Sequence, residues 1–215
     1  MKKKLLAMAS ILCLTLTACG NTATSTKTEE PATEPATEAP AEESSDSELL
    51  TGKYTVCIEI ENYDPITLEL DADAAPITVT NFMKLVNEGF YDGLTFHRII
   101  AGFMMQGGDP TGTGMGGSDE EIKGEFAANG IENPISHKRG VISMARSMAA
   151  DSASSQFFIC HEDSEFLDGQ YAAFGQVISG IETVDAVCAD AIVEDDNGTV
   201  APGNQPKIIR IYEVK

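Results

Sequence analysis

The chain has 215 residues, of which 42% are hydrophobic and none is tryptophan, and its formal net charge is −20. An acidic protein of this kind repels nucleic acid and anionic lipid headgroups, which argues against a nucleic-acid partner. The acidic residues are better explained as a solubilising surface. Residues 51–215 are numerous enough to bury one core of ordinary size.

Residues 1–19 have the pattern of a bacterial export signal. Three lysines precede an apolar run over residues 5–16, which is too short to span a bilayer. The run closes on Leu-Thr-Ala-Cys, which resembles the lipobox of bacterial lipoproteins. An ordinary secretory peptide is the alternative, but Cys19 directly follows Thr-Ala, where a small-residue cleavage site would lie. We expect a lipid on Cys19 that anchors the protein at the extracytoplasmic face of a bacterial cell membrane.

Residues 20–50 have the composition of a disordered tether. Thr, Glu, Ala, Pro and Ser dominate, and Pro-Ala-Thr-Glu occurs twice in succession at residues 31–38. Such a segment has too few apolar side chains to form a core, and its acidic charges repel one another. We therefore expect an extended acidic spacer between the anchor and a folded domain over residues 51–215.

The folded domain opens with a predicted hairpin followed by a helix. Alternation of apolar and polar residues predicts strands at 53–61 and 66–71, with a turn at 62–65. Pro76 then starts a helical pattern that Gly89 ends. One side of this helix carries the apolar residues Val79, Phe82, Met83, Leu85 and Val86.

Beyond this helix the pattern is mostly that of short strands. Residues 95–106 predict two strands or one bent strand, and residues 107–117 predict a glycine-rich loop without the Lys-Ser/Thr ending of a phosphate-binding loop. A second, short helix is predicted at residues 181–188 and a turn at residues 195–198. Four further strands are expected at residues 141–145, 156–160, 172–177 and 207–214.

About eight strands and two helices favour a mainly β domain. We expect a closed eight-stranded antiparallel β-barrel capped by two α-helices, because closure removes exposed strand edges. The pattern alone leaves a β-sandwich open. Three cysteines, Cys57, Cys160 and Cys188, fall in this domain, so at least one thiol has no partner. Their spacing does not suggest a metal site, and we expect no cofactor.

Two long motifs carry the functional signal. The first runs from Phe96 to Asp109 as Phe-His-Arg-Ile-Ile-Ala-Gly-Phe-Met-Met-Gln-Gly-Gly-Asp. The second, within residues 140–175, contains Gly-Val-Ile-Ser-Met-Ala-Arg-Ser, Ser-Ser-Gln-Phe-Phe-Ile-Cys and Phe-Leu-Asp-Gly-Gln-Tyr-Ala-Ala-Phe-Gly. Together they resemble the cyclophilin family of peptidyl-prolyl cis/trans isomerases, especially its bacterial branch, over residues 52–215. The resemblance implies the same capped barrel.

The resemblance also implies the site residues. Arg98 and Gln106 would be catalytic: Arg98 would donate to the prolyl nitrogen of the twisted peptide bond, and Gln106 would orient Arg98 and bind a substrate carbonyl. A surface ion pair is the alternative for Arg98. Four apolar residues would hold the proline ring, although pattern alone assigns them to the core: Phe103, Met104, Phe158 and Leu167. The remaining substrate-binding positions would be Ala145, Arg146, Gln156, Phe166 and Tyr171, with Ser147 beside them.

Three of these positions depart from many family members. Phe166 replaces a tryptophan and Tyr171 a histidine, as in bacterial members, while Arg146 replaces an asparagine. We expect catalysis to persist, because the backbone of Arg146 would make the contact and Tyr171 can still close the pocket. Cyclosporin binding is expected to weaken, because phenylalanine lacks an indole N–H.

The histidines are expected to take no part in the chemistry. Alternation along a strand turns His97 to the opposite face from Arg98. His137 and His161 show no sequence partner that would suggest catalysis.

The leading hypothesis is a monomeric, surface-anchored prolyl isomerase that acts on proline-containing exported polypeptides as they fold. The alternative is a non-catalytic binding module or chaperone that holds proline-containing segments. An intact pair of Arg98 and Gln106 favours the enzyme. No residue pattern supports a carbohydrate- or metal-binding role.

Overall fold

The computed structural model describes residues 48–215. The expected signal, the lipidation site at Cys19 and nearly all of the expected tether lie outside the described residues. In the described part no helix is long and apolar enough to cross a membrane. Leu50, expected at the end of the tether, donates its backbone N–H to Thr80 Oγ1 at 2.8 Å and packs against the core. The folded domain therefore begins no later than Leu50.

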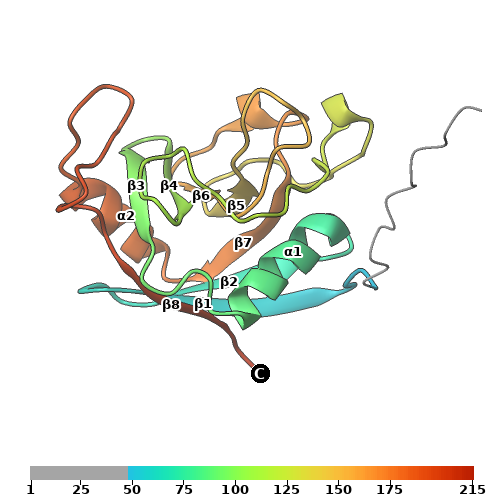
Figure 1. Cartoon of the computed structure of the whole chain (residues 1–215), viewed down its shortest axis with the longest axis horizontal. Coiled ribbons are helices and arrows are strands. Elements are labelled where there is room, and N and C mark those ends of the chain that lie inside the picture. Colours follow the sequence, from blue (N-terminus) through green and yellow to red (C-terminus); the bar gives the residue numbers. More distant parts are fainter. Residues whose placement is uncertain (1–47) are drawn as a thin grey trace, which may run out of the picture. The chain divides into compact units, whose positions relative to one another are not determined.

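Every strand and helix expected from the sequence forms, with ends displaced by only a few residues (Figure 1). The run over residues 95–106 gives two strands rather than one bent strand. The strands are β1 (Lys53–Ile60), β2 (Ile66–Asp71), β3 (Thr95–Ile100), β4 (Met104–Asp109), β5 (Val141–Met144), β6 (Phe157–Cys160), β7 (Ala173–Ser179) and β8 (Ile208–Glu213). The helices are α1 (Pro76–Asn87) and α2 (Ile181–Asp190).

The eight described strands form one antiparallel sheet in the order β3-β4-β6-β5-β7-β2-β1-β8. The sheet curls into a half-barrel, with α2 and α1 on opposite sides of the view in Figure 1. Helix α1 packs against β2 and β8, and α2 against β2 and β4. The mainly β, eight-stranded, two-helix architecture is thus confirmed. Complete closure of the barrel stays a prediction, because β3 and β8 end the strand order.

Two separate apolar clusters stabilise the domain. The main core includes the whole predicted apolar side of α1, and its Phe82 ring lies 5.1–5.7 Å from the rings of Tyr91, Phe157 and Phe174. A smaller cluster joins Met104, Phe158, Cys160 and Leu167. Three of the four residues expected in the proline pocket belong to this smaller cluster, which is distinct from the main core.

All three cysteines of the domain are free and buried. Burial raises the pKa of the Cys160 and Cys188 thiols to about 12, so both stay protonated and unreactive at neutral pH. Within residues 48–215 no cluster of three His, Cys, Asp or Glu side chains could hold a metal ion.

Candidate active site

The pairing of β3 with β4 brings the two expected catalytic residues together. Arg98 and Gln106 are cross-strand partners in this ladder, which is irregular around Arg98. Arg98 Nη1 donates to Gln106 Oε1 at 3.2 Å. Only eight residues separate the two in sequence, so a tight hairpin is enough to build this part of the site.

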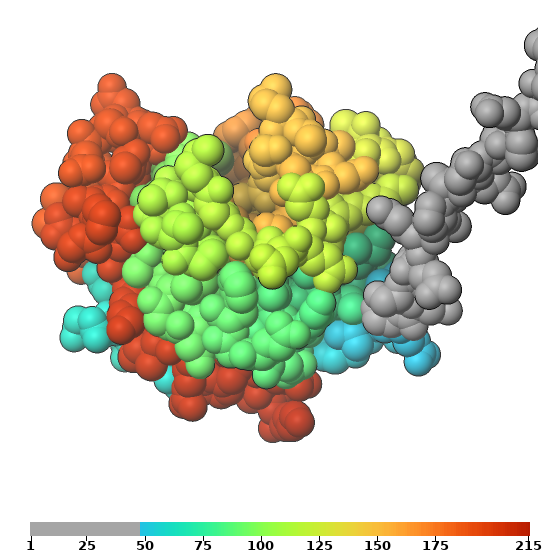
Figure 2. Space-filling model, in the orientation of Figure 1, coloured from blue at the N-terminus to red at the C-terminus, as the bar shows by residue number. Residues whose placement is uncertain are grey.

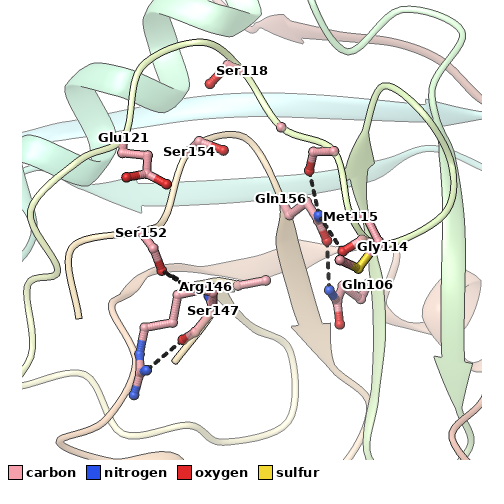
Figure 3. Close-up of a pocket in the computed structure, with 13 residues that line it drawn as sticks. Gln106, Gly114, Met115, Ser118, Glu121, Arg146, Ser147, Ser152, Ser154 and Gln156 are labelled. Carbon is pink, nitrogen blue, oxygen red and sulfur yellow. Dashed lines mark hydrogen bonds between the residues drawn. The ribbon is translucent and has the colours of Figure 1, made fainter. Parts of the chain in front are cut away.

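The amide of Gln106 is the first link in a directed chain of hydrogen bonds, part of which Figure 3 draws. Gln106 Nε2 donates to Gln156 Oε1 at 2.9 Å. Gln156 Nε2 donates in turn to the backbone carbonyls of Gly114 and Gly116 at 3.1 and 2.7 Å. Because the last acceptors are carbonyls, both amides have only one possible orientation, and the oxygen of Gln106 must face Arg98.

A loop after α2 holds Arg98 from its other side. Arg98 Nε donates to the carbonyl oxygen of Asn197 at 2.8 Å, and Nη2 donates to Asn197 Oδ1 at 3.2 Å. None of the ion pairs among residues 48–215 involves Arg98, so the alternative of a surface ion pair is wrong. Burial lowers the pKa of the Arg98 guanidinium from its ordinary value, while Tyr171 and Asp195 act in the opposite direction. The sequence analysis did not identify Asn197.

Arg98 lies at the edge of an apolar cavity of about 350 Å³. Phe158 is buried, lines this cavity and meets the ring of Tyr171 edge-on at 6.0 Å. Phe166 is 67% exposed and lies 5.5 Å from the ring of Phe103 at the rim. Ten of the eleven residues expected to catalyse or bind substrate line this cavity: Arg98, Phe103, Met104, Gln106, Ala145, Arg146, Phe158, Phe166, Leu167 and Tyr171.

Arg146 is fixed by contacts that leave its backbone free. Its Nε and Nη2 donate to the carbonyl of Gln170 at 3.0 and 2.8 Å, and its guanidinium lies 4.7 Å from the ring centre of Tyr171 and 5.0 Å from that of Phe126. Within the described chain, the backbone N–H and C=O of Arg146 make no hydrogen bond. Both groups therefore remain available to an extended peptide.

A second cavity of about 420 Å³ adjoins the first and shares Gln106, Ala145 and Arg146 with it. Gln156, the remaining expected residue, lies here. Figure 2 shows the hollow between the yellow-green loop that follows β4 and the gold segment around residue 150. Its lining is polar, as Figure 3 shows, and its further residues are Gly114, Met115, Gly116, Gly117, Ser118, Glu121, Ser147, Ser152 and Ser154.

Asp109 shapes the loop that borders this second cavity. Its buried carboxylate accepts hydrogen bonds from the backbone N–H groups of Thr111, Thr113, Gly114 and Gly116, and from the hydroxyl of Thr111. Burial opposes ionisation of Asp109, but these hydrogen bonds outweigh it and lower its pKa to about 2. The carboxylate thus holds the carbonyls of Gly114 and Gly116 in place to accept the hydrogen bonds from Gln156 Nε2.

The histidines lie outside the cavity. His97 is buried, and neither ring nitrogen has a hydrogen-bond partner among the described residues. His161 accepts from the backbone N–H of Gly102 and contacts Asp185. His137, expected to have no partner of catalytic interest, in fact lies between Asp168 Oδ1 at 2.8 Å and Ser143 Oγ at 3.0 Å.

The hydrogen-bonded residues Ser143, His137 and Asp168 do not form a nucleophilic catalytic triad. Ser143 is fully buried and His137 is 1% exposed, so no substrate can reach either one. The imidazole of His137 instead stacks at 6.1 Å and 16° on Phe158, a residue that lines the apolar cavity. Burial lowers the pKa of His137, and Asp168 opposes this effect.

Comparison with known proteins assigns the fold and the family. Residues 55–213 match the family model described as "Cyclophilin type peptidyl-prolyl cis-trans isomerase/CLD". The chain is 51% identical over 123 residues to peptidyl-prolyl cis-trans isomerase B of Bacillus subtilis, covering 57% of this chain and 82% of that protein. It is 47% identical over 135 residues to a peptidyl-prolyl cis-trans isomerase of Helicobacter pylori, covering 62% and 80%.

A solved structure agrees with the sequence relatives. The crystal structure of a cyclophilin type peptidyl-prolyl cis-trans isomerase from Cryptosporidium parvum, determined in the presence of the dipeptide Ala-Pro, superposes with a TM-score of 0.66 at 31% identity. The match covers 75% of this chain and 99% of that one. The chain therefore belongs to the family of cyclophilin-type peptidyl-prolyl cis-trans isomerases.

Proposed function

We propose that the cavity beside Arg98 isomerises X-Pro bonds in exported polypeptides, at the extracytoplasmic face of a bacterial membrane to which a lipid on Cys19 tethers the domain. The proline ring enters the apolar cavity over Phe158. The residues that precede the proline run past the free backbone of Arg146 toward Gln156. The domain acts as a monomer and needs no cofactor.

The chemistry follows from the electronic structure of the peptide bond. Rotation about C–N breaks amide resonance, at a cost of roughly 18–20 kcal/mol. In the twisted state the prolyl nitrogen regains a localised lone pair, and a hydrogen-bond donor aimed at it stabilises the transition state but not the planar ground state. In this mechanism Arg98 supplies that donor, and no acid, base or nucleophile is needed.

Two effects together have to lower the activation free energy: the hydrogen bond from Arg98 and the binding of the proline ring in the apolar cavity. One preorganised donor is worth roughly 3–4 kcal/mol in a site that excludes water. An acceleration of about 10⁵ requires roughly 7 kcal/mol. The remainder has to come from holding the proline ring in the apolar cavity, where water cannot solvate the planar amide and the field of the guanidinium is strong.

One observation carries this proposal. At the mouth of the apolar cavity Arg98 is held by neutral oxygens, from Gln106 and Asn197, and by no carboxylate. Its positive charge is therefore fixed in direction but not neutralised. In a chain with a formal charge of −20, a purely structural arginine would be expected to pair with an acid.

Substitution of Arg98 tests the proposal. Arg98→Ala should keep the fold, because Arg98 belongs to neither apolar cluster, and should lower kcat/KM for an Ala-Pro peptide by about 10²–10³. Exchange spectroscopy by NMR measures the rate without a coupling protease, and thermal unfolding checks the fold. Near-wild-type turnover in the folded variant would show that the donor is elsewhere.

The site of action is tested separately. The lipobox-like sequence at residues 16–19 and the acidic, repetitive composition after it support a lipid anchor and spacer. The wild type should partition with membranes and carry a lipid mass on Cys19, while Cys19→Ser should be soluble or unprocessed. A soluble wild type whose N-terminus is not Cys19 would refute the anchor and leave the isomerase proposal untouched.

We also propose that the barrel closes between β3 and the segment before β8. An isolated bridge pairs Thr95 with Lys207, and the backbone N–H of Phe96 donates to the carbonyl of Pro206 at 2.9 Å. Both contacts support closure beside the strand that carries Arg98. The amide of Phe96 should accordingly be protected from hydrogen exchange like those within the ladder.

A further inference from the structure

The loop after α2 forms a small hairpin beside β3. Val193 and Val200 pair as an isolated bridge, and the N–H of Glu194 donates to the carbonyl of Thr199 at 2.7 Å. The Asp195 carboxylate closes the turn by accepting from the N–H and hydroxyl of Thr199. In Figure 1 this segment is the orange-red loop beyond α2. We call residues 193–200 the acidic hairpin, because it contains Glu194, Asp195 and Asp196.

The acidic hairpin is bonded directly to the strand that carries Arg98. The N–H of Ile99 donates to the carbonyl of Gly198 at 2.8 Å, and the N–H of Val200 donates to the carbonyl of His97 at 3.0 Å. Gly198 has φ +79°, and a Cβ there would lie 2.4 Å from the carbonyl oxygen of Ile99. Only glycine allows this close approach, so the hairpin is held at a fixed place beside Arg98.

Asn197, at the tip of the acidic hairpin, contacts Arg98 twice. Its carbonyl accepts from Nε at 2.8 Å, and its side-chain oxygen accepts from Nη2 at 3.2 Å. Two acceptors from one residue fix the plane of the guanidinium as well as its position, while Gln106 holds Nη1. The rotation that would turn the donors away from the cavity is therefore blocked on both sides.

Arg98 keeps two N–H donors that no oxygen accepts. A guanidinium has five N–H groups, and neutral oxygens occupy one on Nε, one on Nη1 and one on Nη2. The second N–H of Nη1 has only the thioether of Met104 at 3.8 Å, which is a weak acceptor. The second N–H of Nη2 has no partner in the described chain. Arg98 thus retains donors for a substrate nitrogen next to the side chains that would hold the proline.

The charges around Arg98 are kept from pairing with it. Two ionisable groups raise the pKa of Arg98 against the effect of burial: Asp195 of the acidic hairpin and Tyr171, which lines the cavity. The carboxylate of Asp195 is occupied by Thr199, and neither Glu194 nor Asp196 forms an ion pair with Arg98. A hairpin with three carboxylates therefore presents an uncharged amide to the guanidinium.

We propose that Asn197 is a positioning residue for isomerisation, whose two neutral oxygens aim the guanidinium of Arg98 without neutralising it. The inference rests on the proposed role of Arg98 as the donor to the prolyl nitrogen. A carboxylate at the same place would hold Arg98 at least as firmly. It would also weaken the field that stabilises the twisted amide, so neutrality is a requirement of the chemistry and not of the fold.

Two substitutions separate aiming from neutrality. Asn197→Ala removes one acceptor and should lower kcat about three- to tenfold with KM unchanged, because aiming affects only the transition state. Asn197→Asp keeps the shape and adds a charge. It should unfold at the same or a higher urea concentration than the wild type, yet lower kcat about tenfold. A merely structural residue would make activity follow stability.

The control is Asp196→Asn, which changes one charge in the same turn at a residue that makes no hydrogen bond to Arg98. It should alter kcat less than twofold. If Asn197→Asp retains wild-type kcat, or loses stability and activity together, the inference is overturned. Arg98→Ala distinguishes a failure of the proposed function from a failure of the positioning role of Asn197. Full turnover in Arg98→Ala refutes the role of Arg98 as the donor. A slow Arg98→Ala beside wild-type rates in both Asn197 variants refutes only the positioning role.

Discussion

Gln106 and Gln156 are joined amide to amide, with Nε2 of Gln106 donating to Oε1 of Gln156 at 2.9 Å. Since Gln106 also accepts from Arg98, the orientation of the Arg98 guanidinium depends on carbonyls three hydrogen bonds away, at Gly114 and Gly116. The glycine-rich loop therefore acts on the site through hydrogen bonds and not by contact with Arg98.

This relay predicts a rank order of effects. Gln106→Ala removes a hydrogen bond to a charged group and should lower kcat/KM by about ten- to 150-fold, since such bonds are worth roughly 1.5–3 kcal/mol. Gln156→Ala leaves the bond to Arg98 in place and should cost only about two- to fivefold. Gln176→Ala, on the exposed part of β7, is the control and should have no effect. Equal losses of kcat/KM in Gln106→Ala and Gln156→Ala would contradict a directed relay.

The elements of the fold could be predicted because they are encoded locally. Alternation marked β1 and β2, and Pro76 with Gly89 marked the ends of α1. The pairing of Arg98 with Gln106 could be predicted for the same reason, since both residues lie in one continuous run. The expected proline pocket could not be distinguished from the core by sequence pattern, because its residues are buried and apolar like those of the core. The family resemblance supplied that distinction.

The contacts that were missed all depend on chain segments far apart in sequence. Asn197 follows Arg98 by 99 residues and reaches it only because the acidic hairpin pairs with β3. His137 meets Asp168 through the packing of two loops. The turn at residues 195–198 was expected, but no local signal states which strand a turn will lie against.

Glu121 predicts a substrate preference. In an extended peptide, side chains two residues apart face the same side, so the residue two positions before a bound proline would reach the second cavity. Glu121 lines that cavity without an ion pair in the described chain, whereas the Arg146 guanidinium is bound to Gln170 and Ser147. A peptide with Lys at this position should be turned over about two- to fivefold faster than one with Glu, consistent with about 0.4–1 kcal/mol for an exposed pair.

Matched variants check the source of this preference. Glu121→Gln should abolish it, and added salt should weaken it. Glu120→Gln is the control, because the neighbouring carboxylate pairs with Lys84 and does not line the cavity. A preference that survives in Glu121→Gln would assign it to another group.

Asp109 predicts a specific acid sensitivity. Its folded pKa of about 2 lies below the ordinary value of 3.8, so its stabilising effect is present above pH 3.8 and is lost as the pH falls toward 2. Asp109→Asn should lower the free energy of unfolding at pH 7 by about 2–3 kcal/mol, measured by urea titration, and should flatten this part of the pH dependence. Asp119→Asn, on the same loop, should change neither. Equal stability of the wild type and Asp109→Asn would contradict the loop-organising role.

The proposed chemistry predicts a flat pH profile of activity. No histidine lines either cavity, and the proposed donor Arg98 is a guanidinium, a group that stays charged across the accessible pH range. kcat/KM for an X-Pro peptide should therefore vary less than twofold between roughly pH 6 and 8. NMR exchange spectroscopy measures this without the pH dependence of a coupling protease.

Stability, in contrast, should depend on pH through two buried histidines. Burial lowers the pKa of His97 and of His137. Both histidines therefore become protonated at about pH 6.5 in the unfolded chain, whereas in the folded domain they stay neutral until a lower pH. The free energy of unfolding should fall as the pH drops below 6.5 toward the folded pKa values, and level off beneath them. Loss of activity in acid should then coincide with loss of far-ultraviolet circular dichroism in the same samples. If activity instead follows a bell-shaped curve while the fold stays intact, a general acid–base group operates and the mechanism built on Arg98 is wrong.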